Sequence, residues 1–291
     1  MKRKIKNSDH GVVGIVVAVL IIGLMVSVVS LIQLIYVPKW MEQKEAEHMD
    51  EVVTQFSNLK FAIDTHVSNK KPDTPIATSF TLGSKELPYL MSVRSYGTLK
   101  IIDSDPDPNI SPFTITIDNV TKSDSYNIGI IKYSSSNAYF IDQSFIYEAG
   151  AIITSQDDGD MLSVKPSFSI LNTSNNVTLF INLTTIASIG GKTIGSGYGT
   201  TAIQTEYSGN YSEDPINGVT AITINTQYPN SWSIYLDWLL KKVYHPSDYT
   251  ITTNADQVNI GFTYISASFI PPDIDLEISE INAQIGAGWI E

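Results

Sequence analysis

Residues 11–37 read GVVGIVVAVLIIGLMVSVVSLIQLIYV and contain no charged side chain. An α-helix rises about 1.5 Å per residue, so about 20 apolar residues are needed to cross a bilayer core of roughly 30 Å. This run is therefore long enough to span a membrane with some tilt. We expect a transmembrane helix over residues 12–37.

The two flanks of the apolar run differ in charge. Residues 1–10 contain three lysines and one arginine against a single acid, Asp9, whereas lysines and glutamates are mixed after the run. Basic residues are retained on the cytoplasmic side of a membrane. The bias predicts a single-pass protein with a cytoplasmic N-terminus and an extracellular C-terminal region.

A cleavable secretory signal peptide does not fit this N-terminus. Its apolar region runs 7–15 residues and ends at a small-x-small cleavage site. Here the apolar run is longer and ends in LIQLIYVPKW (31–40), which offers no such site. An uncleaved single-pass anchor remains one alternative, and cleavage in front of the apolar run is the other.

The junction HGV (10–12), followed by VGI (13–15), resembles the class III signal peptide of archaeal type IV pilins, archaellins and related secreted pilin-like proteins. In that family a prepilin-type peptidase cuts on the cytoplasmic side of the hydrophobic segment, which stays on the mature protein. The resemblance implies a leader of residues 1–11, cleavage between Gly11 and Val12, and this peptidase as a partner. The histidine before the glycine departs from the Lys or Arg that is usual there.

Residues 38–67 are predicted to continue the helix outward as an amphipathic stalk. Pro38 is expected to kink or break the helix, and Trp40 suits the membrane interface. Beyond them, apolar residues recur at spacings of three and four on one helix face. This stalk seam consists of Met49, Val52, Phe56, Leu59 and Ile63. It packs either on the protein's own globular domain or on copies of itself in a filament core.

Residues 68–79, SNKKPDTPIATS, are predicted to form a linker, after which the apolar period changes to two. Strands are expected at 91–102, 113–117, 128–133, 167–170, 176–183, 201–207, 219–224, 249–252 and 258–269. Consecutive strands without intervening helices predict an antiparallel sandwich over residues 80–291. The glycine-rich run 189–199 is either the seam between two sub-domains or one long loop.

One short helix is expected inside the β region. In the segment SWSIYLDWLLKKVY (231–244), one face carries Trp232, Tyr235, Leu236, Leu239 and Val243, and Asn230-Ser231 can cap it. The tail 271–291 alternates apolar and polar residues and is predicted to be a final strand, with a sheet edge as its candidate position. The fold class is thus a long N-terminal α-helix followed by an antiparallel all-β sandwich ectodomain with one short helix.

The composition of the chain argues against several classes of function. The chain has a net charge of −12 and no cysteine. An acidic exterior disfavours nucleic-acid binding, and the lack of cysteine excludes disulfides and thiol chemistry. No catalytic motif or histidine spacing for a metal is present, so we expect neither an enzyme nor a cofactor.

Two further sets of residues are candidates for modification and metal binding. Six Asn-x-Ser/Thr sequons, all in the ectodomain, are candidate N-glycosylation sites: Asn109, Asn119, Asn172, Asn176, Asn182 and Asn210. Asp103, Asp105 and Asp107 alternate as at the start of a calcium loop, but Pro108 stands where that loop needs glycine. A solvated turn is the alternative interpretation for these aspartates.

Two functions remain open at this stage. The resemblance implies a structural pilin-like subunit or minor component of an archaeal cell-surface filament, anchored or assembled through its hydrophobic helix, with copies of itself or other pilin-like subunits as partners. The alternative is a single-pass membrane-anchored extracellular adhesin or binding protein that does not polymerise.

Overall fold

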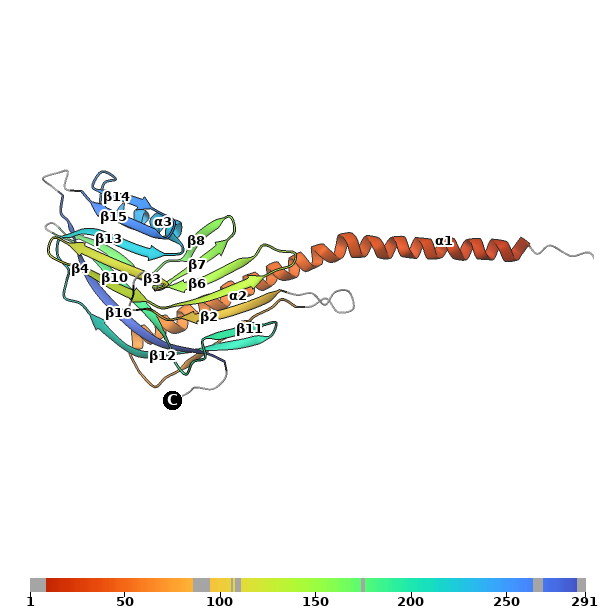
Figure 1. The fold of residues 1–291 in the computed structure, drawn as a ribbon, viewed down its shortest axis with the longest axis horizontal. Helices are drawn as coiled ribbons and strands as arrows, with labels where there is room; N and C mark the ends of the chain where they lie inside the picture. Colours follow the sequence, from red (N-terminus) through yellow and green to blue (C-terminus); the bar gives the residue numbers. More distant parts are fainter. Residues whose placement is uncertain are drawn as a thin grey trace, which may run out of the picture.

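The computed structural model describes residues 9–85, 95–105, 107, 111–173, 176–263 and 269–286 of the 291-residue chain. The chain begins with one continuous helix made of α1 (Asp9–Leu31), the π-helical turn η1 (Ile32–Tyr36) and α2 (Val37–Asn69). By length and composition, Val12–Asn69 is the one helix within these ranges that is able to cross a membrane. Figure 1 shows α1 projecting away from the β-sheets, whereas α2 runs along them.

Pro38 bends the helix and does not break it. Proline lacks an N–H and its ring collides with the preceding turn of a regular α-helix. The turn in front of Pro38 is π-helical, and the Val37 N–H donates to the carbonyl of Ile32, five residues earlier. This wider turn accommodates the proline, and the helix changes direction there in Figure 1.

The described residues after α2 form three β-sheets and one short helix, α3 (Pro229–Leu240). The first sheet has the order β1 (Ile76–Thr81), β12 (Thr200–Ser212), β16 (Pro272–Ile285), β10 (Asn176–Ser188), β9 (Phe168–Thr173). The second is β11 (Ile194–Gly197), β2 (Tyr96–Ile102), β5 (Ile130–Ser136), β6 (Gln143–Glu148), β7 (Ala151–Gln156), β8 (Gly159–Val164). The third is β14 (Tyr249–Thr253), β15 (Gln257–Phe262), β13 (Val219–Thr226), β3 (Phe113–Asn119), β4 (Ser123–Ile128). The predicted fold class is confirmed, with three sheets where a simple sandwich has two.

The stalk seam lies in the core of its own chain. α2 contacts β1, β12 and β16 of the first sheet and β6 and β7 of the second. The resulting stalk core contains Met49, Val52, Phe56, Leu59, Ile63, Phe80, Leu82, Leu99, Ile101, Ile131, Tyr133, Phe145, Tyr147, Ile152, Ile186, Ile203, Tyr207, Ile281, Ala283 and Ile285. Of the two alternatives for the seam, the structure therefore shows packing on the protein's own domain.

A second core, the distal core, lies on the other side of the second sheet. It is centred on Trp232 of α3, whose ring centroid lies 5.3 Å from that of Phe113 and 5.9 Å from that of Phe168. In β6, Phe145 and Tyr147 face the stalk core, whereas Ile146 belongs to the distal core. The second sheet is therefore covered on both faces.

The tail forms a central strand, so the candidate edge position is wrong. β16 pairs in parallel with β10 on one side and antiparallel with β12 on the other. Its residues Ile274, Leu276 and Ile278 enter the distal core, and Ile281 and Ile285 enter the stalk core. A strand that supplies side chains to both cores is held in the interior of its sheet. The β10–β16 pair also departs from a purely antiparallel arrangement.

The predicted apolar face of the short helix is correct for four of its five residues, but its end and its cap are different. Trp232, Tyr235, Leu236 and Leu239 are buried, whereas α3 ends at Leu240 and Val243 lies in the turn beyond it. The helix begins at Pro229, and the N–H of Ser231 donates to Oδ2 of Asp160 at 2.9 Å. The carboxylate of Asp160, which lies in β8 beside the turn between β7 and β8, thus caps the helix in place of Asn230-Ser231.

Two predicted boundaries are placed differently in the structure. β1 begins at Ile76, so the last residues of the proposed linker 68–79 already form a strand. Within the glycine-rich run 189–199, residues 194–197 form β11, which pairs with β2. Parts of the predicted strands 91–102 and 258–269 and the end of the tail lie outside the described residues.

A pair of substitutions on α2 tests the stalk core. Phe56 is fully buried, with its ring 5.3 Å from Phe80 and 5.9 Å from Phe145 between centroids. We expect Phe56→Ala to lower the free energy of unfolding by about 3–5 kcal/mol, because it leaves a cavity. Phe61→Ala, at a residue 75% exposed on the same helix, should change it by less than about 0.5 kcal/mol. Urea unfolding of the full chain in detergent, followed by tryptophan fluorescence, measures both; equal effects would contradict this packing.

Candidate functional site

The apolar half of the long helix stands free of the protein's own domain. Nearly all apolar side chains from Val12 to Tyr36 are exposed, for example Leu24 at 67% and Leu34 at 77%. Exposed apolar surface of this size is stable only in a bilayer or against other proteins. The structure thus has an N-terminal apolar helix of the signal-sequence or membrane-anchor type.

A buried glutamate fixes the start of α2 to the β domain. Glu45 is fully buried, and its carboxylate accepts the backbone N–H groups of Ala138, Tyr139 and Phe140 at 3.0, 2.8 and 2.7 Å. Charge-assisted bonds of this kind are stronger than neutral ones. The loop between β5 and β6, residues 137–142, is thereby clamped to the helix just after it leaves the apolar segment.

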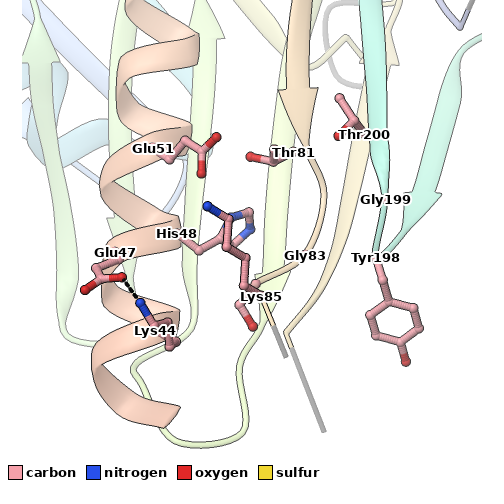
Figure 2. A pocket seen from close by; sticks show the side chains of 11 residues that line it. Lys44, Glu47, His48, Glu51, Thr81, Gly83, Lys85, Tyr198, Gly199 and Thr200 are labelled. Carbon is pink, nitrogen blue, oxygen red and sulfur yellow. Dashed lines mark hydrogen bonds and ion pairs between the residues drawn. The ribbon is translucent and has the colours of Figure 1, made fainter. Parts of the chain in front are cut away.

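A polar cleft of about 490 Å³ lies beside this clamp (Figure 2). Its lining comes from α2, from the residues around the end of β1, and from the start of β12: Lys44, Glu47, His48, Glu51, Thr81, Gly83, Ser84, Lys85, Tyr198, Gly199 and Thr200. Lys44 Nζ and Glu47 Oε2 form an ion pair of 2.6 Å on the rim. Ammonium and carboxylate groups line the cleft, so it is suited to bind a polar or charged ligand.

His48 is held inside the cleft by a chain of hydrogen bonds. Its Nε2 lies 3.0 Å from the Tyr133 hydroxyl, which donates to the carbonyl of Leu82 at 2.8 Å. Because that hydroxyl proton is already used, His48 Nε2–H is the donor in the first bond. Burial lowers the pKa of His48, so a neutral ring serves as a fixed donor at neutral pH. A side chain at Gly97 would collide with both oxygens of this chain.

A second buried carboxyl connects the second sheet to α3. Oε1 of Glu148 accepts bonds from Thr226 Oγ1 at 2.8 Å and Trp232 Nε1 at 2.7 Å. Its Oε2 is buried and has no hydrogen-bond partner among the described residues. Burial raises the pKa of Glu148 to about 7, because desolvation outweighs the two bonds that favour the charged form.

Sequence reasoning missed Glu45, His48 and Glu148 as site residues. Glu45 lies four residues before Met49 and His48 lies four before Val52, so both continue the periodicity of the stalk seam. A polar residue at a core-facing helical position was the available indication. Glu148 had none, because its partners come from β13 and α3, far away in the chain.

The structure does not gather the candidate calcium residues into a metal site. Asp103 accepts hydrogen bonds from the N–H and hydroxyl of Ser188. Oδ1 of Asp105 accepts the N–H of Asp107 at 2.8 Å, as in a turn. Within the ranges that the structure describes, no group of three or more acidic, histidine or cysteine side chains is placed to hold a metal ion.

The candidate glycosylation and cleavage residues are spread over the surface and the first helix. Asn172, Asn182 and Asn210 are exposed, Asn119 and Asn176 are partly exposed, and Asn109 lies outside the described residues. Nδ2 of Asn210 donates to Oε1 of Glu277 at 3.0 Å. Gly11 and Val12 lie in the first turns of α1, and residues 1–8 of the leader lie outside the described ranges. Glycosylation and leader cleavage remain predictions.

Comparison with family models, curated proteins and solved structures finds no match for this chain. The class of protein therefore rests on the architecture: an N-terminal apolar helix that continues into a helix packed on a β-sheet domain.

Removal of the Glu45 carboxylate should release the loop 137–142. We expect Glu45→Ala to lower the free energy of unfolding by about 2–3 kcal/mol, because three backbone donors lose a charged acceptor. Hydrogen exchange at residues 138–140 should accelerate. Glu42→Ala, an exposed glutamate on the same helix, is the matched control and should leave that exchange unchanged. Unaltered protection in Glu45→Ala would contradict the clamp.

Glu148→Gln should stabilise the protein in a pH-dependent way. The pKa of Glu148 is raised from 4.5 to about 7 in the folded state, so wild-type stability falls as pH rises through this window. The variant keeps an acceptor for Trp232 and avoids a buried charge. We expect a gain of about 2–3 kcal/mol at about pH 8 that fades toward about pH 4. The free energy of unfolding of both proteins is measured across this pH range. A gain that does not change with pH would contradict the raised pKa of Glu148.

Proposed function

We propose that this protein is a pilin-like subunit, major or minor, of an archaeal cell-surface filament, with its β domain outside the cell. The observation that carries the proposal is the division of one continuous helix. Residues 12–36 are apolar and exposed, whereas α2 is embedded in the β domain. This layout is similar to that of type IV pilins, and the basic leader and the Gly11–Val12 junction agree with it.

The same division limits where subunits can associate through their helices. The stalk seam is buried inside its own chain and is not available to a neighbouring copy. The exposed side chains of α1 can leave water in the bilayer before assembly and against neighbouring helices afterwards. In this proposal the filament core is therefore built mainly from the exposed side chains of residues 12–36, and the stalk seam takes no part in it.

A substitution at Gly23 in α1 tests filament assembly without changing membrane insertion. Gly23 and Ser27 are small residues one turn apart, and there is open space around Gly23. Small residues let helix backbones approach closely. Gly23→Leu keeps the segment apolar, so the amount of protein in the membrane fraction should not change, whereas filaments in the sheared-cell fraction should be lost. Val26→Leu is the control and should retain filaments, as judged by electron microscopy and immunoblotting.

The N-terminus of the mature protein gives an independent measurement. The proposal predicts that N-terminal sequencing or intact mass finds Val12 as the first residue. Retention of Met1, together with no filaments from the wild type, would contradict it. That outcome would favour a membrane-anchored adhesin, whose helix needs only to span the bilayer.

A further inference from the structure

Strand register defines the end of the β domain that lies next to the membrane helix. Tyr96 at the start of β2 pairs with Ser136 at the end of β5, and Gly97 pairs with Gly197 of β11. The loop 137–142 and the turn at Tyr198 therefore leave the second sheet at the same end. Glu45 binds that loop, which places this end beside the start of α2. In Figure 2, Tyr198 lies across the cleft from Lys44, and its ring extends toward the lower end of the view, where Lys44 also lies.

This end exposes amphipathic and apolar side chains. We call it the helix-exit surface and define it by Trp40, Tyr96, Ile141 and Tyr198, which are 41%, 40%, 51% and 47% exposed. The rings of Tyr96 and Tyr198 meet edge to face with their centroids 5.3 Å apart. Tyrosine and tryptophan suit a boundary that is apolar on one side and wet on the other.

No spacer separates the helix-exit surface from the apolar segment. Tyr36, the last residue of η1, is 46% exposed, whereas Val37 and Met41 are 3% and 0% exposed. Coverage by the domain thus begins at the residue that follows the exposed run. Residues 12–36 extend about 37 Å as a helix, against a hydrocarbon core of roughly 30 Å. When they span a bilayer, the helix-exit surface lies at the level of the headgroups.

We propose that the helix-exit surface is a lipid contact: the β domain rests on the headgroups of the bilayer that holds α1, with Ile141 and Tyr198 at the interface. The contact is continuous with the membrane-spanning segment, because the helix passes from η1 into α2 without a break. Exposed Lys39 lies where a long cationic side chain reaches phosphate. The inference rests on the membrane residence of α1, which is part of the proposed function, but not on polymerisation.

Spin labels at single cysteines test the contact, because the chain has no cysteine of its own. The full chain is placed in vesicles of phosphatidylcholine, with or without phosphatidylglycerol, that contain a nickel-chelating lipid. Nitroxides at Ile141→Cys and Tyr198→Cys should relax faster through the headgroup-bound nickel. Relaxation equal to that of a distant control label would overturn the proposal.

Val120→Cys supplies that distant control. Val120 is 84% exposed and follows Asn119, which pairs with Val219. The N–H of Gly218, next to Val219, donates to Asp273 at the start of β16. At the other end of β16, Ile285 pairs with Ile203, which lies near Tyr198 in the chain. The length of β16, at about 3.3 Å per residue, separates the control from the helix-exit surface.

The remaining outcomes distinguish this inference from the proposed function. Spin–spin broadening at position 141 that vanishes on dilution with unlabelled protein, without a nickel effect, would show that a second copy covers the surface and would overturn the lipid contact. Failure of the wild type to float with vesicles would overturn membrane residence and both proposals. A nickel effect in a protein that never forms filaments would support the lipid contact and contradict the filament proposal.

Discussion

The packing of α2 between the first and second sheets is the contact on which the rest of the structure depends. The stalk seam fills the space between β1, β12 and β16 on one side and β6 and β7 on the other. Glu45 adds three hydrogen bonds from the loop 137–142 at the end of α2 next to the apolar segment. A helix buried in this way cannot slide or rotate freely. The direction in which α1 leaves the domain is therefore set by the core.

The second sheet couples this contact to the other half of the molecule. Because β6 sends Phe145 to the stalk core and Ile146 to the distal core, both cores share one wall. The long strands β10 and β16 run through both cores, and Glu148 links the second sheet to α3. The polar cleft and the helix-exit surface both lie where this assembly meets the apolar segment of the helix.

Prediction from the sequence succeeded for helices and strands that have one buried face and one exposed face. The stalk seam and the buried face of α3 have clear helical periodicity. Over most of β10 and β13, buried residues alternate with partly exposed ones, because only one face of each strand is fully covered. The sequence analysis missed β4, β6, β7 and β8. In β6 and β7, residues Phe145–Tyr147 and Ala151–Ile153 are all buried and show no alternation. β16 looked like a candidate edge strand because its acids alternate with apolar residues, although its neighbours cover it on both sides.

The amino-acid sequence by itself determined the properties that depend on local composition. These are the long apolar helix, the amphipathic stalk and a β-rich C-terminal region, each of which follows from runs and periods within a few turns or strands. Only the tertiary structure decided what the stalk seam packs against, that β16 pairs in parallel with β10, and that Glu45, His48 and Glu148 are buried among specific partners. Those contacts join residues that are far apart in the chain. Their geometry comes from the simultaneous packing of three sheets around two cores, which no local pattern records.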